Sequence, residues 1–96
     1  METLFIVYDV LFERRIRDII ERGMVIPRYT RIDGVIGARS VEMETETSYV
    51  ADRENRMIVA IAEPATIARL VADLRALRAK EGHGLRAFVV PAITVI

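Results

Sequence analysis

Residues 4–20, LFIVYDVLFERRIRDII, contain two different hydrophobic patterns in succession. The first, residues 4–8, is a continuous aromatic and β-branched run, which predicts a strand. Asp9 then suits a helix N-cap, and the apolar residues after it recur at the spacing of one helix face: Phe12, Ile16, Ile19 and Ile20. The segment therefore predicts a strand followed at once by an amphipathic helix, which we expect Gly23 to end.

The second half of the chain repeats this order of elements. Residues 57–62, MIVAIA, predict another strand, and Pro64 suits the first turn of a helix that Gly82 closes. The apolar face of this helix is predicted from five residues at helical spacing: Ile67, Leu70, Val71, Leu74 and Leu77. Between the halves, residues 24–35 predict a strand with Pro27 near its beginning; after them come a strand over 85–90, an interruption at Pro91 and a short edge strand over 93–96.

The resulting order, β-α-β-β-α-β, is the ferredoxin-like α+β arrangement, and we expect it to form one domain over residues 1–96. It predicts a four-stranded antiparallel sheet with both helices on one face. Strands of such a sheet should alternate apolar and polar residues, yet those over 4–8, 57–62 and 85–90 are apolar at consecutive positions. Since two helices cover only one face, the pattern predicts a homo-oligomer in which the open sheet faces pack together.

Composition excludes several classes of protein. Lys plus Arg and Asp plus Glu both number 14, and this zero net charge argues against a general nucleic-acid binder. Cysteine is absent, which excludes disulfides, thiolate metal sites and cysteine nucleophiles. The N-terminus does not resemble a signal peptide, and no apolar stretch approaches the roughly 20 residues of a membrane span. We therefore expect a cytoplasmic protein that does not insert into membranes.

Residues 34–55, GVIGARSVEMETETSYVADREN, are the most polar segment, and their acidic residues alternate: Glu42, Glu44 and Glu46. In a strand these three share one face, opposite Val41, Met43 and Thr45. We expect residues 41–49 to extend the preceding strand as a hairpin arm, with a bulge at Gly34 and Gly37 and a return turn over 51–55. The acidic face fits a solvated hairpin, which also deters edge aggregation, or a site for a cation or a basic partner.

The segment Gly82-His83-Gly84 is a candidate anion site, because its backbone N–H groups and the charge of Arg86 could surround an anion. The alternative is a helix C-cap and turn, where glycine is expected in any case. His83, the only histidine, fits an exposed loop residue or a divalent-metal ligand together with carboxylates. Three further arginines flank the acidic segment and could bind an anion or pair with its glutamates: Arg28, Arg31 and Arg39. The arginines at 69, 75 and 78 predict a solvated helix surface.

Three stretches together carry a resemblance to a known family: Tyr29-Thr30-Arg31 leading to Val35 and Gly37, Glu54-Asn55, and Glu81-Gly82-His83-Gly84-Leu85-Arg86-Ala87-Phe88-Val89-Val90-Pro91. In this order, and with the order of elements above, the chain resembles the PII-like proteins, relatives of the nitrogen-regulatory PII signalling trimers. The resemblance implies a homotrimer with inward-facing sheets. It also implies a small effector, often an adenine nucleotide, in clefts between subunits.

By the same resemblance, the ligand-binding residues would be Thr30, Gly37, Arg39, Gly82, His83, Gly84 and Arg86. The loop over 37–55 would contact a partner protein through Glu42, Glu44, Glu46 and Tyr49. Two positions depart from the family pattern: Leu85 stands between Gly84 and the basic Arg86, and Ala38 replaces a glycine. A divalent metal is a second candidate ligand.

These observations favour a non-catalytic regulatory protein. Acylphosphatases share the order of elements, but they need a glycine-rich, arginine-bearing loop after the first strand, where this chain has Asp9-Val10-Leu11-Phe12. An RNA-recognition domain would carry stacking aromatics on its central strands, and residues 57–62 have none. An amino-acid-binding regulatory domain and a metal-binding ferredoxin-like protein remain alternatives.

Overall fold

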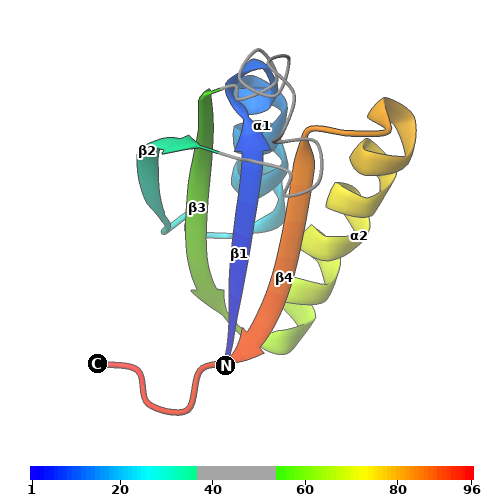
Figure 1. Ribbon diagram of the computed structural model, residues 1–96. Coiled ribbons are helices and arrows are strands. Elements are labelled where there is room, and N and C mark those ends of the chain that lie inside the picture. Colours follow the sequence, from blue (N-terminus) through cyan, green and yellow to red (C-terminus); the bar gives the residue numbers. More distant parts are fainter. Residues whose placement is uncertain (37–53) are drawn as a thin grey trace.

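The computed structural model describes residues 1–36 and 54–96. Along the chain lie β1 (Glu2–Asp9), a short 3₁₀ turn η1 (Val10–Phe12), α1 (Glu13–Gly23), β2 (Thr30–Ile36), β3 (Glu54–Ala62), α2 (Pro64–Glu81) and β4 (Leu85–Pro91). The strands form an antiparallel sheet in the order β2-β3-β1-β4, and both helices lie on one face of it (Figure 1). This is the ferredoxin-like α+β fold that the sequence predicts. None of the helices in the described ranges is long and apolar enough to span a bilayer.

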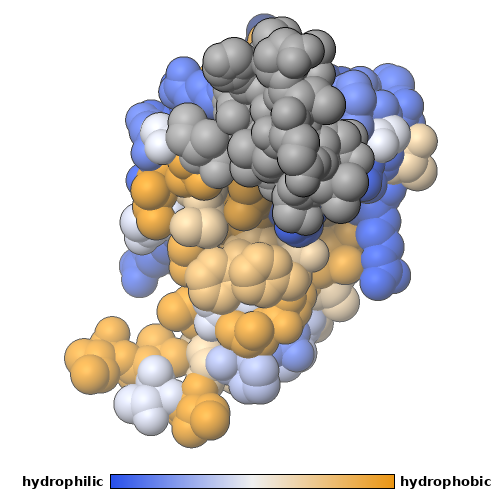
Figure 2. Space-filling view, in the orientation of Figure 1, coloured by the Kyte–Doolittle hydropathy of each residue, from blue (hydrophilic) through white to orange (hydrophobic). Residues whose placement is uncertain are grey.

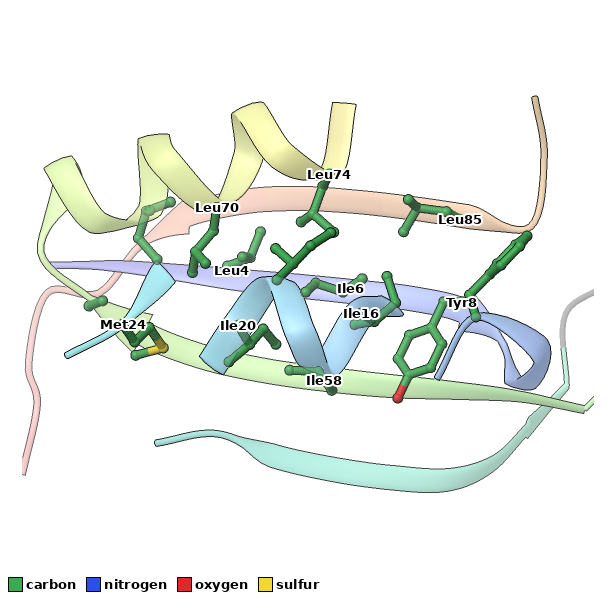
Figure 3. Close-up of a cluster of buried hydrophobic side chains, with 14 residues drawn as sticks. Leu4, Ile6, Tyr8, Ile16, Ile20, Met24, Ile58, Leu70, Leu74 and Leu85 are labelled. Atoms are coloured by element: carbon green, nitrogen blue, oxygen red, sulfur yellow. The ribbon is translucent and has the colours of Figure 1, made fainter. Parts of the chain in front are cut away.

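The core fills the space between the two helices and the sheet (Figure 3). Alternate residues of β1 point into it, because side chains of a strand alternate between its two faces. The side chains that are almost completely excluded from solvent come from every layer: Leu4, Ile6, Tyr8, Ile16, Ile20, Ile58, Ile67 and Leu70. The helical spacing of the sequence therefore predicts the buried faces of α1 and α2 correctly.

The start of α1 differs from the prediction in detail. Asp9 accepts a 3.0 Å hydrogen bond from the backbone N–H of Leu11, so it caps the turn as expected. However, the turn that it caps is the 3₁₀ turn η1, and the α-helix begins only at Glu13.

Gly23 was expected to act as the C-terminal cap of α1, and this prediction is wrong. Gly23 is the last helical residue, is buried and does not have a positive φ, and Met24 is the cap. A side chain at Gly23 would collide with Leu70 of α2. The glycine therefore allows the two helices to approach each other closely. Gly82, in contrast, caps α2 in the left-handed conformation, with φ 81°.

Three predicted strand boundaries are also corrected. β2 begins at Thr30 and not at residue 24, so Pro27 lies in the connection before the strand. β3 begins at Glu54, within the range expected to be a turn, because residues 54–57 pair with β1 and β2. β4 includes Pro91, which an edge strand tolerates at its end, and residues 92–96 form no strand. The hairpin arm predicted over 41–49 lies outside the described residues.

A one-residue irregularity interrupts the pairing of β2 with β3. Ile32 lies opposite Met57 and Val35 opposite Asn55, so β2 has one residue more than β3 between these pairs. Gly34, in this interval, has a φ of 73°, a conformation that glycine adopts without strain. The predicted bulge at the base of the 37–55 loop is therefore present at Gly34.

The sheet face away from the helices is largely apolar (Figure 2). Its central row pairs Phe5 of β1 with Val59 of β3 and with Phe88 of β4, and the rings of Phe5 and Phe88 stack at 4.9 Å. Phe88 remains 48% exposed and Ile61 remains 41% exposed. The sequence correctly predicted apolar residues on both faces of the sheet.

Candidate functional site

The loop between α2 and β4 is shaped by two glycines. Gly82 and Gly84 both have a φ of 81°, which side-chain-bearing residues rarely adopt. The N–H of Gly82 donates to the carbonyl of Arg78 at 2.8 Å, and the carbonyl of Gly84 accepts from the N–H of Asp9 at 2.8 Å. The loop 82–84 is thus tied both to the end of α2 and to the end of β1.

The ring of Phe12 packs against this loop. A Cβ atom at Gly84 would overlap the Phe12 ring, and the ring of His83 lies 6.4 Å from that of Phe12. The guanidinium of Arg15 lies 4.6 Å from the centre of the Phe12 ring and forms a 2.5 Å ion pair with Glu81. The sequence indicated Phe12 only as a core residue and did not indicate Arg15, because their positions depend on tertiary packing.

The predicted anion cradle is therefore only partly available. The Gly82 N–H is already used by the helix cap, so for this residue the alternative interpretation, a C-cap, is correct. His83 is exposed, as expected of a loop residue. Arg86, on β4, pairs with Val7 of β1. Its side chain forms no hydrogen bond or ion pair with another residue of the described ranges. The remaining donors of the candidate site are therefore the loop around His83 and the Arg86 guanidinium.

Thr30 lies far from this loop within one copy of the chain. It is the first residue of β2, which forms one edge of the sheet, whereas loop 82–84 and Arg86 belong to the other edge, at β4. Three strand spacings separate the two edges, which corresponds to about 14 Å. The structure therefore places those predicted ligand residues that it describes in two groups on opposite edges of the sheet.

The other predicted functional residues lie outside the described ranges. These are the ligand-site candidates Gly37 and Arg39 and the partner-contact candidates Glu42, Glu44, Glu46 and Tyr49.

A polar cluster lies where β2 and β3 approach the start of α1. At its centre, Glu13 accepts a 2.5 Å hydrogen bond from the Tyr8 hydroxyl and forms 3.1 Å ion pairs with Arg31 and Arg56. Asp33 pairs with Arg31 at 2.9 Å and lies 3.5 Å from Arg56. We call these five residues the Glu13 cluster; it connects three strands to α1.

The Glu13 cluster shifts the proton affinities of its members. Burial raises the pKa of Glu13, but the hydrogen bonds from Tyr8 and Arg56 and the charge of Arg31 outweigh it, so the net pKa is lowered. Burial, the hydrogen bond to Glu13 and the charge of Glu13 raise the pKa of Tyr8 well above its ordinary value, although Arg31 and Arg56 oppose the shift. Glu13 is therefore held as a carboxylate and Tyr8 as a neutral phenol.

Arg31 was expected either to bind an anion at the base of the loop or to pair with the glutamates at 42, 44 and 46. Among the described residues, its guanidinium contacts Glu13 and Asp33; the three glutamates lie outside the described ranges. The sequence did not identify Glu13 as a partner of Arg31, because Glu13 is 18 residues away along the chain.

The arginines of α2 differ from one another. Arg69 donates a 3.2 Å hydrogen bond to the carbonyl of Gly23, the last residue of α1, so it is more than a solvated surface residue. Arg75 and Arg78 are exposed, and both line a groove beside β4. Within residues 1–36 and 54–96, no group of three or more His, Asp or Glu side chains is arranged to hold a metal ion.

A comparison with protein-family models finds no match for the sequence, and a comparison with curated proteins finds no significant match. Among solved structures, the chain is similar to CPII from Thiomonas intermedia K12 bound to ADP, AMP and acetate, with a TM-score of 0.69 and 20% identity over 92% of this chain and 81% of that one. The apo form of CPII, a nitrogen regulatory PII-like protein, matches with a TM-score of 0.71 and 18% identity over 93% and 85% of the two chains.

A PII-like signalling protein from Thermus thermophilus matches with a TM-score of 0.65 and 18% identity, over 93% of this chain and 83% of that one. These matches cover nearly the whole chain and include both βαβ halves. With its β-α-β-β-α-β order and both helices on one face of the sheet, the chain therefore has the fold of these solved PII-like proteins.

Proposed function

We propose that this chain is a non-catalytic PII-like signalling protein that assembles as a homotrimer. It binds a small anionic effector, an adenine nucleotide in the first instance, between neighbouring copies. The loop over residues 37–55 contacts a partner protein and reports whether the effector is bound, which requires that the effector bind the two loop states with different affinity.

The observation that carries this proposal is the separation of the candidate ligand residues. Thr30 lies at the β2 edge of the sheet, and Arg86 lies at the β4 edge with loop 82–84. One copy of the chain cannot bring the two groups to one small ligand, because the central strands β3 and β1 separate them. Two adjacent copies of a ring can do so, since the β2 edge of one copy then faces the β4 edge of the next.

The open sheet face supports an assembly of this kind. Its exposed apolar side chains come from the edge strands as well as the centre, and burying them against other copies would remove this surface from water. They include Ile32, Ile61, Phe88 and Val90.

The ligands of the solved relatives support the choice of effector. CPII has been solved with ADP, AMP and acetate and with ADP and bicarbonate, all of which include anionic groups. In this chain Arg86 supplies a guanidinium without an ion pair to another described residue, and such a fork matches phosphate or carboxylate geometry. Arg86 is therefore the residue that we expect to hold the anionic part of the effector.

The experiment is a thermal-shift screen of the full chain, followed by calorimetry on each ligand that raises the melting temperature. The screen contains ATP, ADP, AMP, bicarbonate, divalent metal chlorides and amino acids. We expect an adenine nucleotide to raise the melting temperature, because a ligand that binds only the folded state stabilises it. Arg86→Gln should weaken nucleotide binding about tenfold, as expected for the loss of a charged hydrogen bond.

Arg14→Gln is the matched control, since Arg14 is an exposed arginine on α1 that forms no hydrogen bond or ion pair with another described residue. Its nucleotide affinity should equal that of the wild type. An absence of any nucleotide response would overturn the effector half of the proposal. A response to amino acids alone would favour an amino-acid-binding regulatory domain instead.

A further inference from the structure

The strand β3 continues beyond the strand that lies beside it. The pairing of β2 with β3 starts at Thr30, opposite Val59, whereas β3 runs on to Ala62. Figure 1 shows the result: beyond the start of β2, no described strand lies beside the end of β3 on that side. Residues 60–62 therefore form a short free edge of the sheet, which we call the open β3 edge.

The backbone of Ile61 supplies the hydrogen-bonding groups of the open β3 edge. The N–H of Asp9 and the carbonyl of Met1 both bond to residues that flank β4, so the backbone groups of odd-numbered residues of β1 point towards β4 and those of even-numbered residues towards β3. By the register of the two strands, Ala60 and Ala62 then face β1, and Ile61 faces the opposite way. Its N–H and carbonyl have no strand partner among the described residues, and its side chain is 41% exposed. A free edge of this kind can pair with another extended chain.

Residues 92–96, AITVI, follow β4 and are apolar except for Thr94. The N–H of Ala92 donates to the carbonyl of Met1 at 3.0 Å, and after this bond the segment leaves the sheet without forming a strand. Ile93 is 95% exposed and Val95 is 50% exposed. In Figure 2 the segment stands out from the body of the molecule as a largely apolar projection. Its β-branched residues favour a strand, and burying their side chains would lower the free energy.

The segment 92–96 cannot pair with the open β3 edge of its own copy. It starts beside β4, and the outer side of β3 lies three strand spacings away, which is about 14 Å. Five residues extend over about 17 Å at most, so the crossing would use nearly all of residues 92–96. None of them would then run alongside Ile61. The segment of a second copy has no such constraint, because it can approach the edge from outside.

We propose that residues 92–96 of one copy add to the open β3 edge of a second copy as a short strand. The backbone groups of Ile61 would bond to the added strand, and alternate side chains of that strand would cover the Ile61 side chain. The contact is continuous with the open apolar sheet face, since Phe88 and Val90 of β4 lead into the segment. The inference rests on the proposed assembly of copies and names a segment that links them.

The first test is disulfide cross-linking, which suits this chain because it contains no cysteine. A tagged Ile61→Cys variant is mixed in turn with untagged Ile93→Cys, Thr94→Cys and Val95→Cys, and each mixture is oxidised. Neighbouring strands bring Cα atoms within the distance of about 7 Å that a disulfide requires. We expect tagged–untagged pairs either with Thr94→Cys or with both Ile93→Cys and Val95→Cys, because alternate residues of a strand share a face. Equal yields at all three positions, or no tagged–untagged pair, would overturn the proposal.

The second test measures the dissociation constant of the assembly by sedimentation equilibrium. Ile93→Glu/Val95→Glu should raise this constant at least tenfold, because the added carboxylates would be buried between two copies. The matched control is Ala72→Glu/Ala76→Glu, which adds the same charge at exposed positions of α2 and should stay within twofold of the wild type. Equal weakening by both double variants would mean repulsion by overall charge only and would overturn the proposal. So would an unchanged constant for Ile93→Glu/Val95→Glu.

These outcomes separate the contact from the trimer and the effector proposed above. Alternating cross-links in a protein that sediments as a dimer would support the contact and refute the trimer. A trimer that neither cross-links nor responds to Ile93→Glu/Val95→Glu would support the trimer and refute the contact. Neither test contains a nucleotide, so a failure of the effector proposal would leave both results unchanged.

Discussion

The Tyr8 hydroxyl donates a 2.5 Å hydrogen bond to Glu13 Oε1, which joins the end of β1 to the first residue of α1. The same carboxylate forms ion pairs with Arg31 of β2 and Arg56 of β3. One acidic side chain thus connects β1 to the two strands that precede and follow the segment 37–53. Because the pKa of Glu13 is lowered and that of Tyr8 is raised, we expect the hydrogen bond between them to be lost in acid and in alkali.

The first prediction concerns stability in acid. The pKa of Glu13 in the folded protein is lowered below its ordinary value of 4.5, so its stabilising contribution is present above that value and is lost as the pH falls through the folded pKa. We expect Glu13→Gln to reduce the free energy of unfolding at neutral pH and to reduce its loss between neutral and acid pH. Urea denaturation at a series of pH values measures both quantities.

Glu21→Gln is the control, because Glu21 is an exposed glutamate of α1 and forms no hydrogen bond or ion pair with another described residue. Its pH dependence should follow that of the wild type. Parallel pH profiles for wild type and Glu13→Gln would contradict the role assigned to the Glu13 cluster.

The second prediction concerns stability in alkali. The raised pKa of Tyr8 means that its phenol stays neutral in the folded protein, whereas in the unfolded chain it ionises near its ordinary value of 10.0. The neutral Tyr8 phenol therefore stabilises the folded protein fully below that pH, and this stabilisation is lost as the pH rises above it. Phenolate absorbance should show a tyrosine that ionises only when the protein unfolds, and Tyr8→Phe should remove this signal.

The third prediction separates two glycines that have the same φ. Gly82→Ala should cost about 1 kcal/mol, because the left-handed conformation disfavours a side chain but the space beside it is open. Gly84→Ala should cost about 1–3 kcal/mol more, because its methyl group would overlap the Phe12 ring. Chemical denaturation of both variants measures the difference.

Phe12→Leu combined with Gly84→Ala tests the cause. If the ring is the obstacle, the smaller side chain should recover part of the additional loss, and the two substitutions will be non-additive. Equal costs for Gly82→Ala and Gly84→Ala would show that Phe12 does not constrain the loop.

The fourth prediction concerns the open sheet face. We expect the wild type to have a mass near three times 10.9 kDa in light scattering, and Phe88→Glu to run near 10.9 kDa because a charge would be buried against another copy. Val25→Glu is the matched control, since Val25 is 98% exposed and precedes β2 outside the sheet. A wild type that is monomeric in dilute solution would refute the trimer.

The sequence predicts the order of elements and the buried helix faces because these depend on local periodicity. Ile16 and Ile20 of α1, and Leu70 and Leu74 of α2, are buried as their spacing indicates. Gly23 was misinterpreted because a helix-ending glycine and a glycine at a helix contact look the same until Leu70 is placed beside it.

The candidate site was less predictable. Gly82 and Gly84 could be identified because positive φ values favour glycine in a short loop. The groups that surround them could not: Arg15 reaches Glu81 across 66 positions of the chain. Arg75 and Arg78 were interpreted as solvated surface, because nothing in their spacing indicates that α2 lies beside the free edge of β4.

The extra residue of β2 between Ile32 and Val35 also determines how this strand should be aligned with those of relatives. Side chains of a regular strand change face at every position, so residues three apart would normally lie on opposite faces. Here Ile32 and Val35 share one face, since their partners Met57 and Asn55 are two positions apart. The alternation of side chains between the two faces therefore holds up to Ile32 and starts again from Val35 onwards. Deleting one residue at positions 33–34 would place Val35 two positions after Ile32, so a regular strand would keep both side chains on the same face and the same partners on β3.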